Sequence, residues 1–161
     1  METLVASAVP AQRPSRRLAH AYACFARLLD GLQPLAALAM RVYVAKVFFV
    51  SGMLKFERWD ATLALFENEY HVPLLAPMTA AILGTALELV LPVPLALGIG
   101  TRAVALALFV FNIVAATSYP DLSPAGLKDH VLWGVLMLVL AVYGAGRFSV
   151  DGWLARRAAR R

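Results

Sequence analysis

The segment that decides the fold runs from Ala80 to Leu95 and reads AAILGTALELVLPVPL, with one charged residue, Glu88. Apolar residues continue on both sides, so the run is long enough for a bilayer-spanning helix, which takes roughly 20 mostly apolar residues. A carboxylate near the middle of such a helix is costly unless a partner group or a water-filled cavity accommodates it. Glu88 therefore predicts a buried polar site inside a membrane protein.

The composition supports a membrane protein. Of 161 residues, 61% are hydrophobic, whereas soluble domains are about 45–50% apolar. The net charge of +5 comes from basic residues at the chain ends and in short connections, a pattern that favours a membrane protein with no nucleic-acid partner. The single cysteine, Cys24, excludes an internal disulfide and a Cys-ligated iron–sulfur cluster, so a redox role requires a borrowed cofactor or a partner.

Four apolar stretches are predicted to span the membrane, at about 35–56, 74–99, 101–118 and 130–147. Their short connections favour antiparallel neighbours. The predicted fold class is all-α: a polytopic membrane protein with an antiparallel bundle of four transmembrane helices. The predicted organisation is a cytoplasmic tail with an interfacial helix at 1–34, the transmembrane domain at 35–147 and a basic cytoplasmic tail at 148–161.

The flanking charges predict the orientation of these spans. Arginines cluster before the first span and after the fourth, and Arg102 stands in the turn between the second and third spans. Acidic residues dominate the other two loops. Because all basic regions fall on one side of a four-span arrangement, both termini are expected in the cytoplasm.

Two segments outside the spans carry apolar residues at helical spacing. The first comprises Leu18, Ala21, Tyr22, Phe25, Leu28, Leu29 and Leu32. Gly31 and Pro34 predict its end, and the stripe is typical of an amphipathic helix lying on the cytoplasmic leaflet. The second comprises Trp59, Leu63, Phe66 and Tyr70. It predicts a short loop helix over the outer end of the bundle, either packing on its neighbours or acting as a lid.

The partner of Glu88 is predicted on the first span. Lys46 lies at a matching depth, and Arg41 lies one to two turns nearer the cytoplasm with a longer side chain. The helical phase points these two in different directions, so only one of them is expected to pair. Two interpretations stay open: a buried pair that fixes the bundle, or an acid that handles a ligand or a proton. One turn later, Pro92 and Pro94 predict a kink.

The outer ends of the first and fourth spans carry the remaining polar candidates. Lys55 and His130 occupy these ends, and Trp133 follows His130 by one turn. One interpretation is an aromatic belt residue beside a helix-end histidine. The other is a site for a quinone headgroup or a proton, because imidazole exchanges protons near neutral pH and an indole can stack on a ring. No set of His, Asp and Glu has the spacing of a metal site.

The order of these residues forms a longer pattern. It includes Arg41, Ser51, Gly52 and Lys55, then the run from Glu88 through Arg102, then His130, Trp133, Gly144, Gly146, Ser149 and Asp151. The pattern resembles the DoxX family over about 35–154. Gly52, Arg102, Gly146 and Asp151 match its motifs, and so does Arg41. Lys46 does not, which favours Arg41 as the partner of Glu88.

The resemblance implies a small four-helix protein of the bacterial inner membrane, because DoxX-like proteins have that architecture and some are associated with redox complexes. The first hypothesis is a small membrane subunit that binds a quinone non-covalently through Lys55, His130 and Trp133, with electrons from a partner protein. The alternative is a non-catalytic scaffold or assembly factor for a partner protein. A homodimer is compatible with either.

Overall fold

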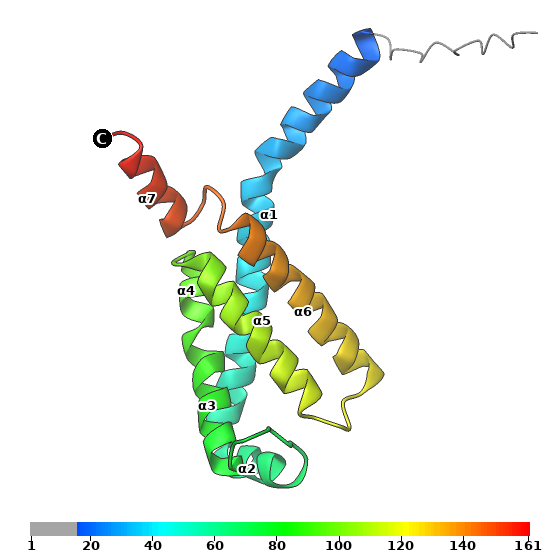
Figure 1. The fold of residues 1–161 in the computed structure, drawn as a ribbon, viewed down its shortest axis with the longest axis vertical. Coiled ribbons are helices and arrows are strands. Elements are labelled where there is room, and N and C mark those ends of the chain that lie inside the picture. The colour runs from blue at the N-terminus through cyan, green and yellow to red at the C-terminus, as the bar shows by residue number, and fades with distance from the viewer. Residues whose placement is uncertain (1–15) are drawn as a thin grey trace, which may run out of the picture. The chain divides into compact units, whose positions relative to one another are not determined.

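The computed structural model describes residues 16–161, and every regular element within that range is a helix (Figure 1). The elements are α1 (Arg16–Glu57), α2 (Trp59–Asn68), α3 (Pro77–Val90), α4 (Pro92–Leu97), α5 (Thr101–Thr117), α6 (Pro124–Tyr143) and α7 (Val150–Ala158). The chain divides into two compact units, and the boundary lies between Leu32 and Gln33. The predicted all-α class is confirmed.

Three stretches of the described chain are long and apolar enough to cross a membrane: α1, α3 with α4 (Pro77–Leu97), and α6. The apolar helix α5 has 17 residues, the lower end of the range of about 17–25 that spanning requires. Its length follows from Gly100 before it and the turn at Ser118 after it. Three stretches of the described chain therefore support the predicted membrane character, and the four-span bundle stays a prediction.

Helix α1 differs from the prediction, because it runs unbroken for 42 residues through Gly31 and Pro34. A proline inside a helix removes one hydrogen bond and costs about 3 kcal/mol. Pro34 is buried, and a Cβ added to Gly146 would lie 3.4 Å from its Cα, so packing offsets part of that cost. In the unit before Gln33, the side chains of the predicted apolar stripe are exposed, Leu18 by 67% and Phe25 by 57%. Their position on a membrane surface stays a prediction.

The second predicted span is interrupted at Leu91, where α3 ends and α4 begins with Pro92 in its first turn. The interruption agrees with the proline pair, since proline suits a first helical turn, where its missing N–H has no partner in any case. Gly98 and Gly100 then adopt left-handed backbone angles, φ +73° and +56°. This tight turn connects α4 directly to α5.

The main core lies among α1, α4, α5 and α6. Its buried residues are Val44, Ala45, Phe48, Leu95, Ala105, Leu108, Met137 and Leu140, and Figure 1 shows α5 running beside α6. A smaller cluster joins Phe66 of α2 to Ala80 and Ala81 of α3. The predicted loop helix is thus present as α2. The amide of His71 donates to Ser118 O at 2.7 Å, which fixes the α2–α3 loop against the end of α5.

Candidate functional site

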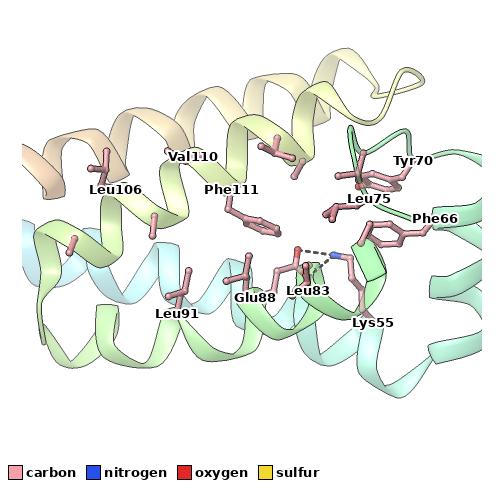
Figure 2. Close-up of a pocket in the computed structure, with 18 residues that line it drawn as sticks. Lys55, Phe66, Tyr70, Leu75, Leu83, Glu88, Leu91, Leu106, Val110 and Phe111 are labelled. Atoms are coloured by element: carbon pink, nitrogen blue, oxygen red, sulfur yellow. Dashed lines mark hydrogen bonds and ion pairs between the residues drawn. The ribbon is translucent and has the colours of Figure 1, made fainter. Parts of the chain in front are cut away.

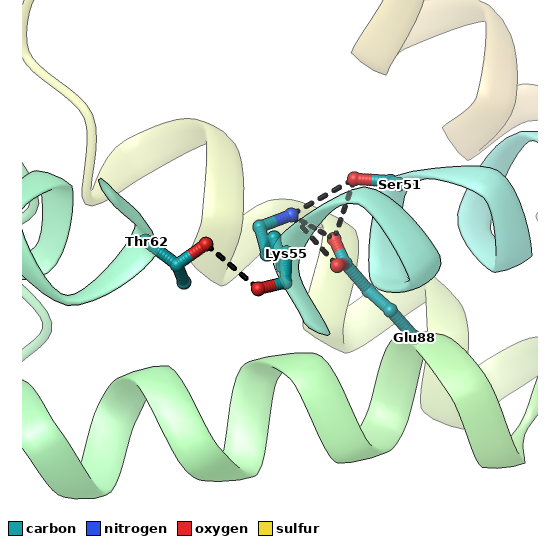
Figure 3. Close-up of polar contacts among 4 residues, drawn as sticks. All are labelled: Ser51, Lys55, Thr62 and Glu88. Carbon is teal, nitrogen blue, oxygen red and sulfur yellow. Dashed lines mark hydrogen bonds and ion pairs between the residues drawn. The ribbon is translucent and has the colours of Figure 1, made fainter. Parts of the chain in front are cut away.

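Glu88 is paired with Lys55 of α1 (Figure 3). Lys55 Nζ lies 2.7 Å from both carboxylate oxygens of Glu88 and donates to Ser51 Oγ at 2.8 Å. The Ser51 hydroxyl donates to Glu88 Oε1 at 3.2 Å. The side chains of Lys55 and Glu88 are 18% and 8% exposed. The predicted pairing of Glu88 with Arg41, or alternatively Lys46, is wrong.

The physical reason for this partner is the register of α1 against α3. Ser51 and Lys55 are four residues apart, so they share one helical face, and the long Lys55 side chain reaches Glu88 from the C-terminal end of α1. Lys46 is exposed, and Arg41 is buried near the opposite end of the bundle. The one sequence signal for this arrangement is the run from Ser51 through Gly52 to Lys55.

Gly52 allows α1 and α3 to come into contact at this pair. A Cβ added to Gly52 would lie 2.9 Å from Glu88 Cβ and 3.0 Å from Leu89 Cγ, closer than packed carbon atoms approach one another. Any larger residue would separate the two helices. Gly52 therefore sets the distance at which Lys55 meets the Glu88 carboxylate.

Replacement of Gly52 by alanine is expected to lower the free energy of unfolding by roughly 1–3 kcal/mol, because the added methyl group overpacks the helix contact. Gly84→Ala is the matched control: it lies on α3, and its added Cβ would meet Phe66 Cζ at an ordinary 3.5 Å. Thermal unfolding of both variants in one detergent measures the difference. Equal melting temperatures for the two variants would show that Gly52 does not set the spacing.

The ion pair faces a cavity of about 650 Å³ between α3 and α5 (Figure 2). Apart from Lys55, Glu88 and Tyr70, the cavity is lined by apolar residues and Gly84. Figure 2 shows Phe111 pointing from α5 toward Glu88. The lining residues Leu83, Leu106 and Val110 are 46%, 52% and 53% exposed. Exposed apolar side chains of α3 and α5 therefore border the cavity.

Three aromatic rings stack on one another, and two of them, Phe66 and Tyr70, line the cavity. Phe66 stacks on Tyr70 with centroids 4.7 Å apart, and Tyr70 stacks on Tyr119 with centroids 5.0 Å apart. The Tyr119 hydroxyl donates to Glu69 Oε2 at 2.7 Å. Burial, and then the nearby charge of Glu88, raise the pKa of Tyr70. Tyr70 therefore remains a neutral phenol at physiological pH, able to donate or accept a hydrogen bond.

His130 and Trp133 pack away from this cavity, in the contact between α5, α6 and α1. His130 Nδ1 lies 2.7 Å from Asn112 Oδ1, and Asn112 Nδ2 donates to His130 O at 2.9 Å. The Trp133 ring meets His130 and Phe48 edge-on, with centroids 5.0 Å and 5.8 Å apart. Of the three predicted quinone-binding residues, Lys55 alone lines the cavity.

A second polar cluster joins the ends of α4, α5 and α6. Arg41 is fully buried and donates to Ala96 O at 3.3 Å and to Phe148 O. Carbonyls at a helix C-terminus carry partial negative charge, so they suit a guanidinium. This places Arg41, the predicted partner of Glu88, in a different site.

Asp151 completes the second cluster by capping α5. Its carboxylate accepts from the amides of Gly100 and Thr101, each at 2.9 Å. Burial raises the pKa of Asp151, but these amide hydrogen bonds outweigh it and hold the pKa below its ordinary value. A Cβ added to Gly144 would lie 3.3 Å from Nε of the exposed Arg102, and Gly146, with φ +74°, packs against Ala37. Of the predicted motif residues, Asp151 caps α5, Gly146 packs against α1, and Arg102 lies beside Gly144.

The described residues contain no group of three or more His, Cys, Asp or Glu placed to hold a metal. Cys24 is a free, exposed thiol on α1. The side chains that line the cavity offer hydrogen bonds, charge and an apolar wall.

The all-helical architecture, with three stretches long and apolar enough to cross a membrane, indicates an integral membrane protein. The chain belongs to the DoxX family, whose profile matches residues 36–120. This stretch contains Gly52, Lys55 and Glu88, whereas His130 and Trp133 lie beyond it. Comparisons with curated proteins and with solved structures gave no match.

Proposed function

We propose that this protein is a small inner-membrane subunit of a redox complex and that it binds a quinone non-covalently in the cavity between α3 and α5. The observation that carries the proposal is the Lys55–Glu88 pair on the wall of a mostly apolar cavity that exposed apolar side chains border. A quinone matches such a site because it joins a polar ring to a long apolar tail. The ring lies at the pair, and the tail leaves between the helices into the bilayer.

The size and lining of the cavity support this ligand class. Small-molecule sites typically measure about 300–1,000 Å³ and combine apolar walls with few polar groups, and the cavity of about 650 Å³ has both properties. The aromatic rings of Phe66 and Phe111 line it and offer faces or edges to a ligand ring.

In this proposal, a partner protein carries the group that exchanges electrons with the quinone. With one cysteine in its sequence, the chain has no dithiol of its own to exchange electrons with a quinone. Its part in the complex is to hold the quinone and the groups around its ring. The partner supplies or accepts the electrons.

In the proposed topology α5 is a fourth span, and both termini are cytoplasmic. The arginines of the C-terminal tail and Arg102 are at one end of the helices, and Glu69 and Asp121 are at the other. The positive-inside rule places the arginine-rich end in the cytoplasm. The Lys55–Glu88 pair then lies in the outer half of the membrane.

Purified protein is expected to retain quinone, and Ala107→Phe is expected to lower the retained amount at least tenfold by filling the cavity. Ala107 is exposed and lines the cavity, so the larger ring does not enter the core. Ala39→Phe is the matched control, because Ala39 is an exposed helical alanine outside the cavity lining. Solvent extraction and chromatography of each protein, purified in mild detergent, measure the quinone content.

Equal quinone content in wild type and Ala107→Phe would contradict the proposed site. Protein without quinone, recovered in a fixed ratio with one partner, would favour the scaffold or assembly factor instead. The two results are distinguishable in the same purified sample.

A further inference from the structure

We infer that the cavity prefers a ligand that donates a hydrogen bond, the quinol rather than the quinone. The inference rests on the proposed function and names the form of the ligand. It follows from a count of the hydrogen bonds that Ser51, Lys55 and Glu88 already make with one another (Figure 3).

The donors of this cluster are all in use. A lysine ammonium has three N–H groups, and Lys55 directs them to Ser51 Oγ, Glu88 Oε1 and Glu88 Oε2. A serine has one O–H group, which Ser51 gives to Glu88 Oε1. A ligand that reaches the ion pair therefore finds no free donor on either residue.

The acceptors are not all in use. A carboxylate has about four acceptor positions, two on each oxygen. Oε1 of Glu88 accepts from Lys55 and Ser51, whereas Oε2 accepts from Lys55 alone. Glu88 lines the cavity, so the open position on its carboxylate is the hydrogen-bonding capacity that the pair offers a ligand.

The two forms of a quinone differ in what they bring to such a site. A quinol hydroxyl donates to the Glu88 carboxylate, whereas the carbonyls of the oxidised ring only accept. To gain a donor from the ion pair, the oxidised ring must first take Lys55 away from Ser51 or from one carboxylate oxygen. Tyr70 also lines the cavity, but its phenol donates and accepts, so it serves both forms alike.

The expected preference is at least tenfold, because a hydrogen bond to a charged group contributes enough free energy for that ratio. The probes are a benzoquinone with a decyl tail and its two-electron-reduced quinol, titrated anaerobically into the full-length protein in detergent. A second pair isolates hydrogen bonding from redox chemistry: an alkylphenol, which donates, and its methyl ether, which does not. Isothermal titration calorimetry gives all four affinities, and the quinol and the phenol are expected to bind more tightly than their counterparts.

Ser51→Ala tests the donor count directly. Without the hydroxyl, one N–H of Lys55 becomes free, so the affinity for the oxidised ring is expected to rise and the preference for the quinol to fall below threefold. Thr62→Val is the matched control, because the Thr62 hydroxyl donates to the backbone oxygen of Lys55 (Figure 3) and leaves the ammonium unchanged. This variant is expected to keep the full preference.

The outcomes separate this inference from the function on which it rests. Oxidised quinone that binds as tightly as the quinol, or an ether that binds as tightly as the phenol, would overturn the preference and leave the quinone site standing. Failure of both quinone forms to bind wild type would overturn the proposed function itself.

Discussion

Lys55→Met is expected to lower the free energy of unfolding by about 3–5 kcal/mol, because it leaves the carboxylate of Glu88 buried without its cation. Glu88 is 6% exposed, so little water replaces the lost partner. The double variant Lys55→Met, Glu88→Met is expected to recover most of this loss, since apolar residues replace both charges at once. Unfolding curves for Lys55→Met, Glu88→Met and the double variant, all in one detergent, give the coupling energy between the two residues.

Additive losses in the double variant would contradict a direct ion pair. The double variant also separates folding from ligand binding, because it restores the packing but not the polar groups that face the cavity. It is therefore expected to fold and to retain no quinone.

Gly98→Ala is expected to destabilise the protein by roughly 2–5 kcal/mol, the sum of a left-handed backbone angle and a steric clash. Its φ is +73°, and an added Cβ would clash with Nη1 of Arg41 and with Ser149 Cβ. Gly100→Ala is the matched control: its φ is +56°, but no atom lies within 4 Å of an added Cβ. That variant is expected to lose only about 1–2 kcal/mol, the cost of the backbone angle.

The two glycine variants are compared by thermal unfolding in one detergent. If Gly98→Ala were as stable as Gly100→Ala, Arg41 would not fill the space beside Gly98. The comparison thus tests the cluster that joins α4 to the α6–α7 connection.

The class of fold was predictable because local rules determine it. Runs of apolar residues predict membrane helices whatever their partners are, and Pro92 predicts the break that lies between α3 and α4. The stripe from Trp59 to Tyr70 predicts α2 for the same reason. Pro34 did not end the helix as predicted, because part of its cost is offset by a contact with a residue more than a hundred positions later, Gly146.

The partner of Glu88 was not predictable to the same degree, because it depends on the register between two helices. Depth along each span pointed to Lys46 or Arg41, while the register follows from the close contact at Gly52. The cavity depends on how far α3 and α5 stand apart after the turn at Gly98, and no local pattern encodes that separation. His130 and Trp133 have suitable chemistry but lie outside the cavity. Their chemistry alone could not show this, because it depends on that separation.

The most direct test of the central claim is photolabelling of the purified protein with a benzoquinone that carries an azide on its ring. Peptide mass spectrometry then identifies the labelled residues. We expect labels within 83–91, which covers the end of α3 and Leu91, or within 103–115 of α5, and their loss in Ala107→Phe. Labels confined to 130–133, unchanged in that variant, would contradict a quinone site at the Lys55–Glu88 pair.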